Sequence, residues 1–402
     1  MNSEKRIVVI GQGYVGLNLA ISAGKEFKIY GFDINAKLIE RLSSGLSHIE
    51  DVSDSQIMKA IGEGRYIPTN SQELISAADI YVICVPTPLD HNREPDLSFL
   101  ESATILIAEV ATKPALIINE STSFPGTLRN YIKKKIEEIS TVKHSYASSP
   151  ERVDPGRQDY SQSNTPRLIG ALDDHALNKA LDFYSKFCNS IYKVSSPEVA
   201  EAAKLFENTF RQVNIALVNE FAQIAHSMQI PVREVLEAAD TKPYGFMRFN
   251  PSAGVGGHCI PVDPSYLSFA AEESGINARF IDLANEVNLD MGRYVVERVV
   301  KDNKSSIRGK KVQIVGVAYK ANVADTRETP AENIYKELIR HGAIVNWHDP
   351  LVSFWMDSTS SQLGSDIAII VTLHDFMDAE SILQSTSYVF DTTGKVKGAT
   401  QL

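Results

Sequence analysis

The residues with the clearest chemical potential lie in one loop at positions 254–264, which read Gly-Val-Gly-Gly-His-Cys-Ile-Pro-Val-Asp-Pro. Cys259 is a potential nucleophile, and the glycines before it place little side-chain bulk near its backbone, so a substrate can approach closely. The chain also begins with a dinucleotide-binding fingerprint, Gly-Gln-Gly-Tyr-Val-Gly at 11–16. A nucleophilic thiol and a cofactor that accepts hydride can together oxidise an aldehyde held as a covalent thio-adduct.

The fingerprint lies where a dinucleotide-binding domain requires it. A strand is expected at 6–11, directly before the glycines, and a second strand at 27–33 ends in Asp33, 22 residues after Gly11. This spacing suits a carboxylate that binds the adenosine ribose. Asp33 favours NAD over NADP, because it would repel a 2′-phosphate.

Four further side chains are candidates for the chemistry. Lys204 and Asn208 are four residues apart, so they share one face of a predicted helix and are suited to an oxyanion hole, or else to a structural pair. Asp263 could orient a water or tune Lys204, and its alternative role is to stabilise a turn. Glu151, within a Ser-Pro-Glu string, is a candidate general base, although such strings also begin ordinary loops.

The elements that must position these residues repeat along the chain. Further strands are expected at 79–85 and 115–119, and the same rhythm returns at 311–316, 343–349, 366–371 and 388–391. Alternating strands and helices predict an α/β protein with two Rossmann-like, doubly wound parallel sheets. The second copy reads Gly-Val-Ala-Tyr-Lys at 316–320, without the three glycines. It is therefore not expected to bind a second NAD; its lysine could meet the phosphates of another nucleotide, or this sheet could merely complete the core.

A long helix is expected between the two copies. Ser195 or Ser196 can cap it, Pro197 suits its first turn, and it can run to about Ile230, roughly 50 Å at about 1.5 Å per residue. A helix of this length bridges domains or forms a subunit interface, and its apolar period favours a homodimer. The expected domains are an NAD-binding domain at 1–196, a central helical domain at 197–300 and a second Rossmann-like domain at 301–402.

Composition limits the other classes of function. A formal net charge of −10 disfavours nucleic acid or an anionic membrane as the main partner. The three cysteines are far apart, which fits neither a disulfide framework nor a zinc site; we expect Cys84, at a strand end, and Cys188, in a helical stretch, to be packing residues. Without a signal-peptide pattern or an apolar span, the expected location is the cytoplasm.

Several strings, in order, resemble the UDP-glucose/GDP-mannose dehydrogenase family, and most of all its bacterial UDP-N-acetylglucosamine 6-dehydrogenases. They are Gly-Gln-Gly-Tyr-Val-Gly-Leu at 11–17, Val-Pro-Thr-Pro at 85–88, Glu-Ser-Thr-Ser-Phe-Pro-Gly-Thr at 120–127, Ser-Pro-Glu-Arg-Val-Asp-Pro-Gly at 149–156, Glu-Ala-Ala-Lys-Leu-Phe-Glu-Asn at 201–208, Gly-Gly-His-Cys-Ile-Pro-Val-Asp-Pro at 256–264 and Asp-Thr-Arg at 325–327.

The resemblance implies an NAD-dependent, four-electron oxidation of the primary alcohol of a UDP-sugar to a carboxylate, for surface polysaccharide synthesis. Cys259 would carry a thiohemiacetal and then a thioester, while Lys204 and Asn208 stabilise oxyanions and Asp263, Thr122 and Glu151 handle water and protons. It implies cofactor contacts from Gly11, Gly13, Tyr14, Val15, Gly16, Asp33, Thr87, Thr122 and Arg327. It implies substrate contacts from Glu151, Lys204, Asn208, Arg248, Phe249, Gly256 and Lys320.

The chain departs from the family pattern near the sugar. Relatives commonly have Pro-Gly-Pro-Gly where this chain has Pro-Ser-Ala-Gly at 251–254, and Arg248 could bind phosphate, also from a neighbouring subunit, or be a surface residue. UDP-N-acetylglucosamine is the first expected substrate, with UDP-N-acetylmannosamine and UDP-glucose as alternatives. Two other classes remain open: a two-electron hydroxyacid-type dehydrogenase, and a non-catalytic nucleotide-sugar sensor, which the intact set of candidate residues disfavours.

Overall fold

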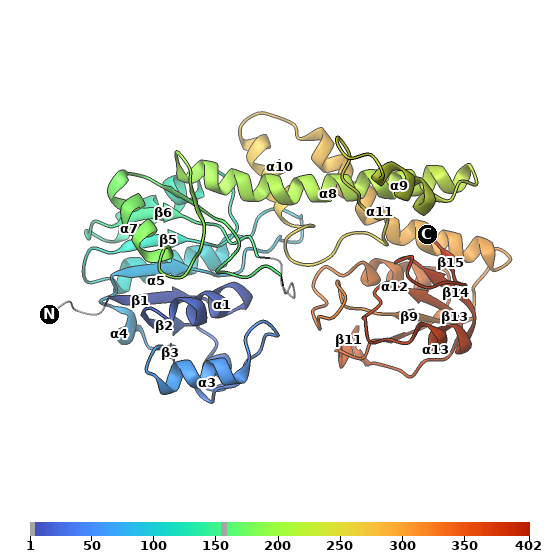
Figure 1. The fold of residues 1–402 in the computed structure, drawn as a ribbon, viewed down its shortest axis with the longest axis horizontal. Helices are drawn as coiled ribbons and strands as arrows, with labels where there is room; N and C mark the ends of the chain where they lie inside the picture. Colours follow the sequence, from blue (N-terminus) through green and yellow to red (C-terminus); the bar gives the residue numbers. More distant parts are fainter. Residues whose placement is uncertain (1–4, 154–158) are drawn as a thin grey trace. The chain divides into compact units, whose positions relative to one another are not determined.

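The computed structural model describes residues 5–153 and 159–402, so the Asp-Pro-Gly of the Ser-Pro-Glu string lies outside the described residues. The chain divides into two compact units, Met1–Glu207 and Asn208–Leu402 (Figure 1). One helix, α8 (Pro197–Ser227), crosses the boundary between them. Both units are α/β, which confirms the predicted fold class with its two Rossmann-like sheets and long central helix.

The first unit contains a sheet of eight strands in the order β3-β2-β1-β4-β5-β6-β7-β8. The first six are parallel and follow the strand order of a dinucleotide-binding fold, while β7 is antiparallel to β6. The strands are β1 (Arg6–Ile10), β2 (Lys28–Phe32), β3 (Tyr66–Thr69), β4 (Ile80–Ile83), β5 (Leu116–Asn119), β6 (Ser145–Ser148), β7 (Arg167–Ala171) and β8 (Ile191–Lys193).

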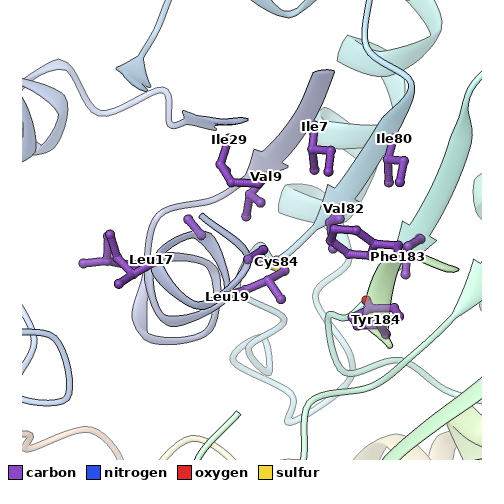
Figure 2. Packing of buried hydrophobic residues seen from close by; sticks show 14 of the residues in the cluster. Ile7, Val9, Leu17, Leu19, Ile29, Ile80, Val82, Cys84, Phe183 and Tyr184 are labelled. Atoms are coloured by element: carbon purple, nitrogen blue, oxygen red, sulfur yellow. The ribbon is translucent and has the colours of Figure 1, made fainter. Parts of the chain in front are cut away.

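Both faces of the centre of this sheet are buried, because β1, β4 and β5 consist almost entirely of apolar residues. Along β1, Ile7 and Val9 pack into one core (Figure 2), and Val8 and Ile10 pack into the other, as the alternation of side chains in a strand requires. The helices of this unit are α1 (Tyr14–Ala23), α2 (Ala36–Ser43), α3 (Asp54–Gly62), α4 (Gln72–Ile75), α5 (Ser98–Val110), the π-helix η1 (Thr127–Lys133), α6 (Lys134–Ile139) and α7 (Asp174–Tyr184).

The second unit contains a parallel sheet of five strands in the order β10-β9-β13-β14-β15. Its strands are β9 (Lys311–Val315), β10 (Ile344–His348), β13 (Ser365–Ile370), β14 (Thr386–Asp391) and β15 (Thr400–Gln401), with a separate hairpin of β11 (Phe354–Trp355) and β12 (Ser358–Thr359). Its remaining helices are α9 (Val232–Asp240), α10 (Asp263–Glu273), α11 (Arg279–Asp302), α12 (Pro330–Arg340) and α13 (Ala379–Gln384).

Helix α8 is slightly shorter than the sequence predicts. It begins at Pro197 as expected but ends at Ser227 rather than near Ile230. Gln229 has a φ of 59°, and the amide of Ile230 donates to the carbonyl of Ala225 at 2.8 Å. This left-handed residue with a bond back across the last turn closes the helix C-terminus. Among the residues described, no helix is both long and apolar enough to cross a membrane.

Candidate active site

The glycine fingerprint forms the turn between β1 and α1. Gly11 has a φ of 89°, and a Cβ on Gly16 would lie 1.8 Å from the carbonyl oxygen of Gly11, so these two glycines permit the turn and the close packing of the helix. A Cβ on Gly13, in contrast, would have no atom within 4 Å. The open side of Gly13 is where a pyrophosphate approaches the helix N-terminus, so the turn fits the predicted dinucleotide.

Asp33 lies at the end of β2, beside this turn. One of its carboxylate oxygens accepts a hydrogen bond from the backbone amide of Gln12 at 2.8 Å, and the other accepts from Asn35 at 2.9 Å. The Gln12 side chain is fully buried and accepts a bond from the hydroxyl of Tyr66 at 2.7 Å. The acid is therefore held at the edge of the turn, in the position that suits a ribose hydroxyl.

The other predicted cofactor residues of the first unit follow the same edge of the sheet. Thr87 comes after β4 and Thr122 after β5, and both are half-buried. Tyr14 begins α1, and its hydroxyl donates to Glu50 at 2.9 Å, while Val15 packs against the core. The carboxyl ends of parallel strands are where a doubly wound sheet binds its ligands.

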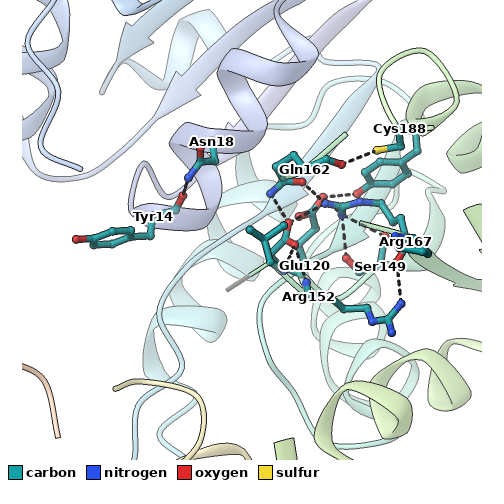
Figure 3. Close-up of polar contacts among 12 residues, drawn as sticks. Tyr14, Asn18, Glu120, Ser149, Arg152, Gln162, Arg167 and Cys188 are labelled. Atoms are coloured by element: carbon teal, nitrogen blue, oxygen red, sulfur yellow. Dashed lines mark hydrogen bonds and ion pairs between the residues drawn. The ribbon is translucent and has the colours of Figure 1, made fainter. Parts of the chain in front are cut away.

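Two buried carboxylates and one arginine form a cluster at this edge (Figure 3). Arg167, at the start of β7, contacts Glu120 and Glu151 with one terminal nitrogen each, both at 2.8 Å. Its guanidinium also lies over the ring of Tyr184, 4.6 Å from the centroid. Arg167 is 4% exposed, Glu120 2% and Glu151 8%, so these ion pairs are shielded from water. A buried charge of this kind requires such partners.

Glu151 is bonded through both carboxylate oxygens. One oxygen accepts from the backbone amides of Arg152 at 2.6 Å and Val153 at 2.7 Å, and the other accepts from Arg167 and the side chain of Gln162. Burial alone would raise its pKa, but Arg167, the two amides and the charge of Lys204 hold the pKa below its usual value. The structure therefore places Lys204 near Glu151 and keeps Glu151 ionised.

Helix α8 is fixed to the segment that carries Thr122. The buried carboxylate of Glu201 accepts from the amides of Gly126 at 2.7 Å and Leu128 at 3.0 Å, at the start of η1. Lys204 lies almost one turn further along α8 and is nearly buried. This contact gives Lys204 and the loop after β5 a common support.

In the second unit, Cys259 lies at the entrance to α10. It is half-buried and forms no disulfide. Its carbonyl oxygen accepts from the amide of Asp263 at 2.8 Å, and the Asp263 carboxylate accepts from the side chain of Asn208 at 2.5 Å. Three of the predicted catalytic residues are thus brought together: Cys259, Asp263 and Asn208.

The glycines before Cys259 have a different function from the one the sequence suggests. They do not leave open space; a Cβ on Gly257 would lie 2.8 Å from the ring of Tyr319, and one on Gly256 would lie 2.8 Å from its Cβ. The amide of Gly257 also donates to the carbonyl of Arg327 at 3.0 Å. The glycines permit close packing of the loop that carries Cys259 on the loop after β9. This packing fixes the backbone directly before Cys259.

The remaining predicted residues of the second unit lie in two places. Lys320 and Arg327 belong to the loop after β9, where Arg327 forms an ion pair with Asp325. Arg248 is 3.8 Å from a carboxylate oxygen of Glu237 on α9, and Phe249 packs against Phe210 of α8 with ring centroids 6.1 Å apart. Arg248 is also 3.9 Å from a carboxylate oxygen of Asp240, so it has two acidic neighbours on α9.

The turn after β9 is built like its counterpart in the first unit but has Ala318 at the position of Gly13. Asp349, at the end of β10, accepts from the amides of Val317 at 2.9 Å and Ala318 at 3.1 Å with one oxygen. Its other oxygen is 3.0 Å from Nε2 of His374, and both side chains are fully buried. Asp349 thus holds the turn after β9 as Asp33 holds the glycine turn, with one further amide bonded.

Sequence reasoning missed three of these residues. Arg167, Tyr184 and Asp349 have no motif of their own, although an arginine at the start of an apolar strand is a signal of a buried ion pair. It also placed Cys188 in a helix, whereas α7 ends at Tyr184 and Cys188 follows it, buried, with its thiol 3.5 Å from the carbonyl of Gln162. Cys84 is buried as expected, and burial raises the pKa of its thiol.

Comparison with known proteins places these features in one family. Sequence models of the UDP-glucose/GDP-mannose dehydrogenase family match in order: its NAD binding domain at residues 5–188, its central domain at 198–290 and its UDP binding domain at 313–397.

Named relatives and a solved structure cover nearly the whole chain. The chain is 35% identical to a UDP-N-acetyl-D-mannosamine dehydrogenase of Methanococcus maripaludis over 92% of its length and 86% of the relative. It is 35% identical to a UDP-N-acetyl-D-glucosamine 6-dehydrogenase of Pseudomonas aeruginosa over 87% and 84%. The structure of a UDP-D-ManNAc dehydrogenase from Pyrococcus horikoshii matches with a TM-score of 0.88 at 31% identity, covering 98% of each chain.

Proposed function

Because this chain belongs to the UDP-glucose/GDP-mannose dehydrogenase family and is an NAD-dependent UDP-sugar dehydrogenase, we propose that it oxidises carbon 6 of a UDP-N-acetylhexosamine to a carboxylate. UDP-N-acetylglucosamine is the substrate first expected from the sequence. UDP-N-acetylmannosamine is the second candidate, because the relatives with that name are as similar to this chain. UDP-glucose is a third, more distant alternative.

The observation that carries the proposal is the grouping of Cys259, Asp263 and Asn208 around the start of α10. In the proposed reaction, the thiolate of Cys259 adds to the aldehyde formed by the first oxidation and gives a thiohemiacetal. The second oxidation converts it to a thioester, and water then releases the uronic acid and the thiol. NAD bound at the glycine turn would accept a hydride in each of the two oxidations, so two NADH would form per sugar.

We assign each candidate residue a role in this reaction. The ammonium of Lys204 and the amide of Asn208 stabilise the negative charge on the oxygen of the tetrahedral adduct. The bond from Asn208 to Asp263 orients that amide. Asp263 and Thr122 position water, and Lys320 and Arg248 bind the diphosphate or sugar. The anion of Glu151 lies near Lys204 and favours its charged form.

We further propose that the protein is a homodimer with α8 at the interface. The exposed side of this helix carries a row of large apolar side chains at spacings of four and seven residues, as in a helix–helix seam. This row, called the apolar row of α8 below, consists of Val199, Phe206, Phe210, Leu217 and Ile224. We also propose the three domains expected from the sequence, with their limits after residues 196 and 300.

The decisive experiment is the number of moles of NADH released per mole of nucleotide sugar with excess NAD. The panel contains UDP-N-acetylglucosamine, UDP-N-acetylmannosamine and UDP-glucose. Two equivalents with one of the three would support the thiol-mediated double oxidation and identify the sugar. One equivalent would mean an aldehyde product and would contradict the proposed role of Cys259, whereas no turnover with any sugar would favour a nucleotide-sugar sensor.

A further inference from the structure

The two carboxylates that share Arg167 are not equally satisfied. Glu151 receives four hydrogen bonds, two on each oxygen. Glu120 receives its contacts on one oxygen, Oε1, from Arg167 at 2.8 Å and from the hydroxyl of Tyr184. Its second oxygen, Oε2, is buried and has no hydrogen-bond partner among the residues described. A buried carboxylate oxygen without a donor strongly disfavours the ionised form.

The surroundings of Glu120 increase this difference. It extends from the end of β5 and faces Arg167 from β7, Glu151 from the loop after β6, Tyr184 from α7 and the buried thiol of Cys84 after β4. Arg167 provides one positive charge for two carboxyl groups. When both carboxylates are ionised, the three groups in contact, Glu120, Glu151 and Arg167, carry a net negative charge away from water. This is costly, so one carboxyl group of such a pair takes up a proton readily.

We propose that Glu120 is the residue of this site that gains and loses a proton while Glu151 stays ionised, so that the charge of Glu120 sets how strongly Arg167 holds Glu151. Glu120 is thus a positioning residue that acts through Arg167. When Glu120 is neutral, Arg167 forms an ion pair with Glu151 alone. When Glu120 is ionised, the two carboxylates compete for the guanidinium of Arg167. Glu151 in turn affects the charge of Lys204.

The expected titration range agrees with this geometry. Burial raises the pKa of Glu120 to about 7, although Arg167 and the Tyr184 hydroxyl oppose the shift. The pKa of Glu151 is lowered, despite its burial, by Arg167 and by the amides of Val153 and Arg152. The two carboxyl groups that share Arg167 therefore have well-separated pKa values, and Glu120 is the one that changes charge near pH 7.

The test uses the full-length protein with Glu120→Gln, which keeps an acceptor for Tyr184 and Arg167 but cannot ionise. Glu101→Gln is the matched control, because Glu101 also pairs with a cation, Lys135 at 2.8 Å, but near the surface. Thermal unfolding is followed without substrate from about pH 5 to about pH 8. Because the folded-state pKa of Glu120 is raised, its contribution is fully present below the unfolded-state value and is lost as pH rises through about 7.

We therefore expect the unfolding temperature of the wild type to fall by several degrees relative to Glu120→Gln across this range. The Glu101→Gln control should not show this trend. A difference between wild type and Glu120→Gln that is the same at every pH would mean a purely structural role and would overturn the proposal. Tyr184→Phe should move the transition to higher pH, because the Tyr184 hydroxyl favours the ionised form; a shift to lower pH would also contradict the proposal.

The second readout is the pH profile of kcat with the active UDP-sugar, and this part alone rests on the proposed function. The wild type should show an inflection near pH 7 that is absent in Glu120→Gln and retained in the Glu101→Gln control. An inflection that persists in Glu120→Gln would assign the titration to another group and overturn the proposal. Lack of turnover with every sugar would contradict the proposed function, while the unfolding experiment would still decide the titration of Glu120.

Discussion

Replacing Gly13 by alanine should separate cofactor binding from folding in this protein. A Cβ at this position would meet no atom within 4 Å, and the φ of −74° suits an L-residue. Folding stability should therefore change little, or rise by about 0.4–1 kcal/mol through the lower entropy of the unfolded chain. The same methyl group would stand on the open side of the turn, where it would separate the amides of α1 from a pyrophosphate.

The size of the loss follows from the contacts that the methyl group would prevent. A hydrogen bond to a charged group contributes about 1.5–3 kcal/mol, so the loss of one such bond should weaken NAD binding by about 10- to 150-fold. Isothermal titration calorimetry measures the affinity for NAD, and thermal unfolding of the unliganded protein measures stability. The predicted result is weak binding by a protein that unfolds at the temperature of the wild type or slightly above it.

Two other glycines provide the controls. Gly16→Ala would place a Cβ 1.8 Å from a backbone oxygen that cannot move aside, so it should destabilise the protein by about 1–3 kcal/mol or more. Gly62→Ala, in α3, has the same open surroundings as Gly13 but lies away from the fingerprint, so it should leave NAD affinity unchanged. If Gly13→Ala bound NAD as tightly as Gly62→Ala, the assignment of the pyrophosphate site would be refuted.

The remaining predictions concern the thiol and the interface. Cys259→Ser should lower steady-state turnover by about 10³-fold or more, because a serine hydroxyl is a much weaker nucleophile than a thiolate, and slow trapping of the substrate as an ester should be visible by mass spectrometry. An unchanged rate would exclude the covalent mechanism. Leu217→Glu, in the apolar row of α8 and 62% exposed, should convert a dimer to a monomer in light scattering, whereas Met58→Glu, 55% exposed on α3, should not. A monomeric wild type would contradict the interface.

The central strands of both sheets were predictable because short apolar runs with glycine or aspartate at their ends leave few alternatives, whereas β3, β6, β7, β8 and β15 were not predicted. The strand expected at 27–33 is β2 (Lys28–Phe32), and the one expected at 311–316 is β9 (Lys311–Val315). The chemical motifs were also visible, since Gly13 and Cys259 lie in strings whose residue types and order are rare by chance. Fold class and family followed from those patterns.

The buried ion pairs were not predictable in the same way. Arg167 is 47 residues from Glu120 along the chain and 16 from Glu151, and only the order of β5, β6 and β7 in the sheet brings the three together. The glycines before Cys259 give a second example. Their small size indicates in the sequence that space is needed there, but only the structure shows that Tyr319 occupies this space. Local patterns specify elements, whereas the partners of a buried charge depend on topology.

The turn after β9 has a consequence for how many cofactors one chain can hold. Asp349 bonds the amides of Val317 and Ala318 much as Asp33 bonds the amide of Gln12, so the carboxylate itself does not set the two turns apart. The difference lies at the position of Gly13, whose open side faces the ligand, because the second turn has Ala318 there. The duplicated architecture thus differs by one methyl group at this turn, and saturation with NAD should stop at one molecule per chain.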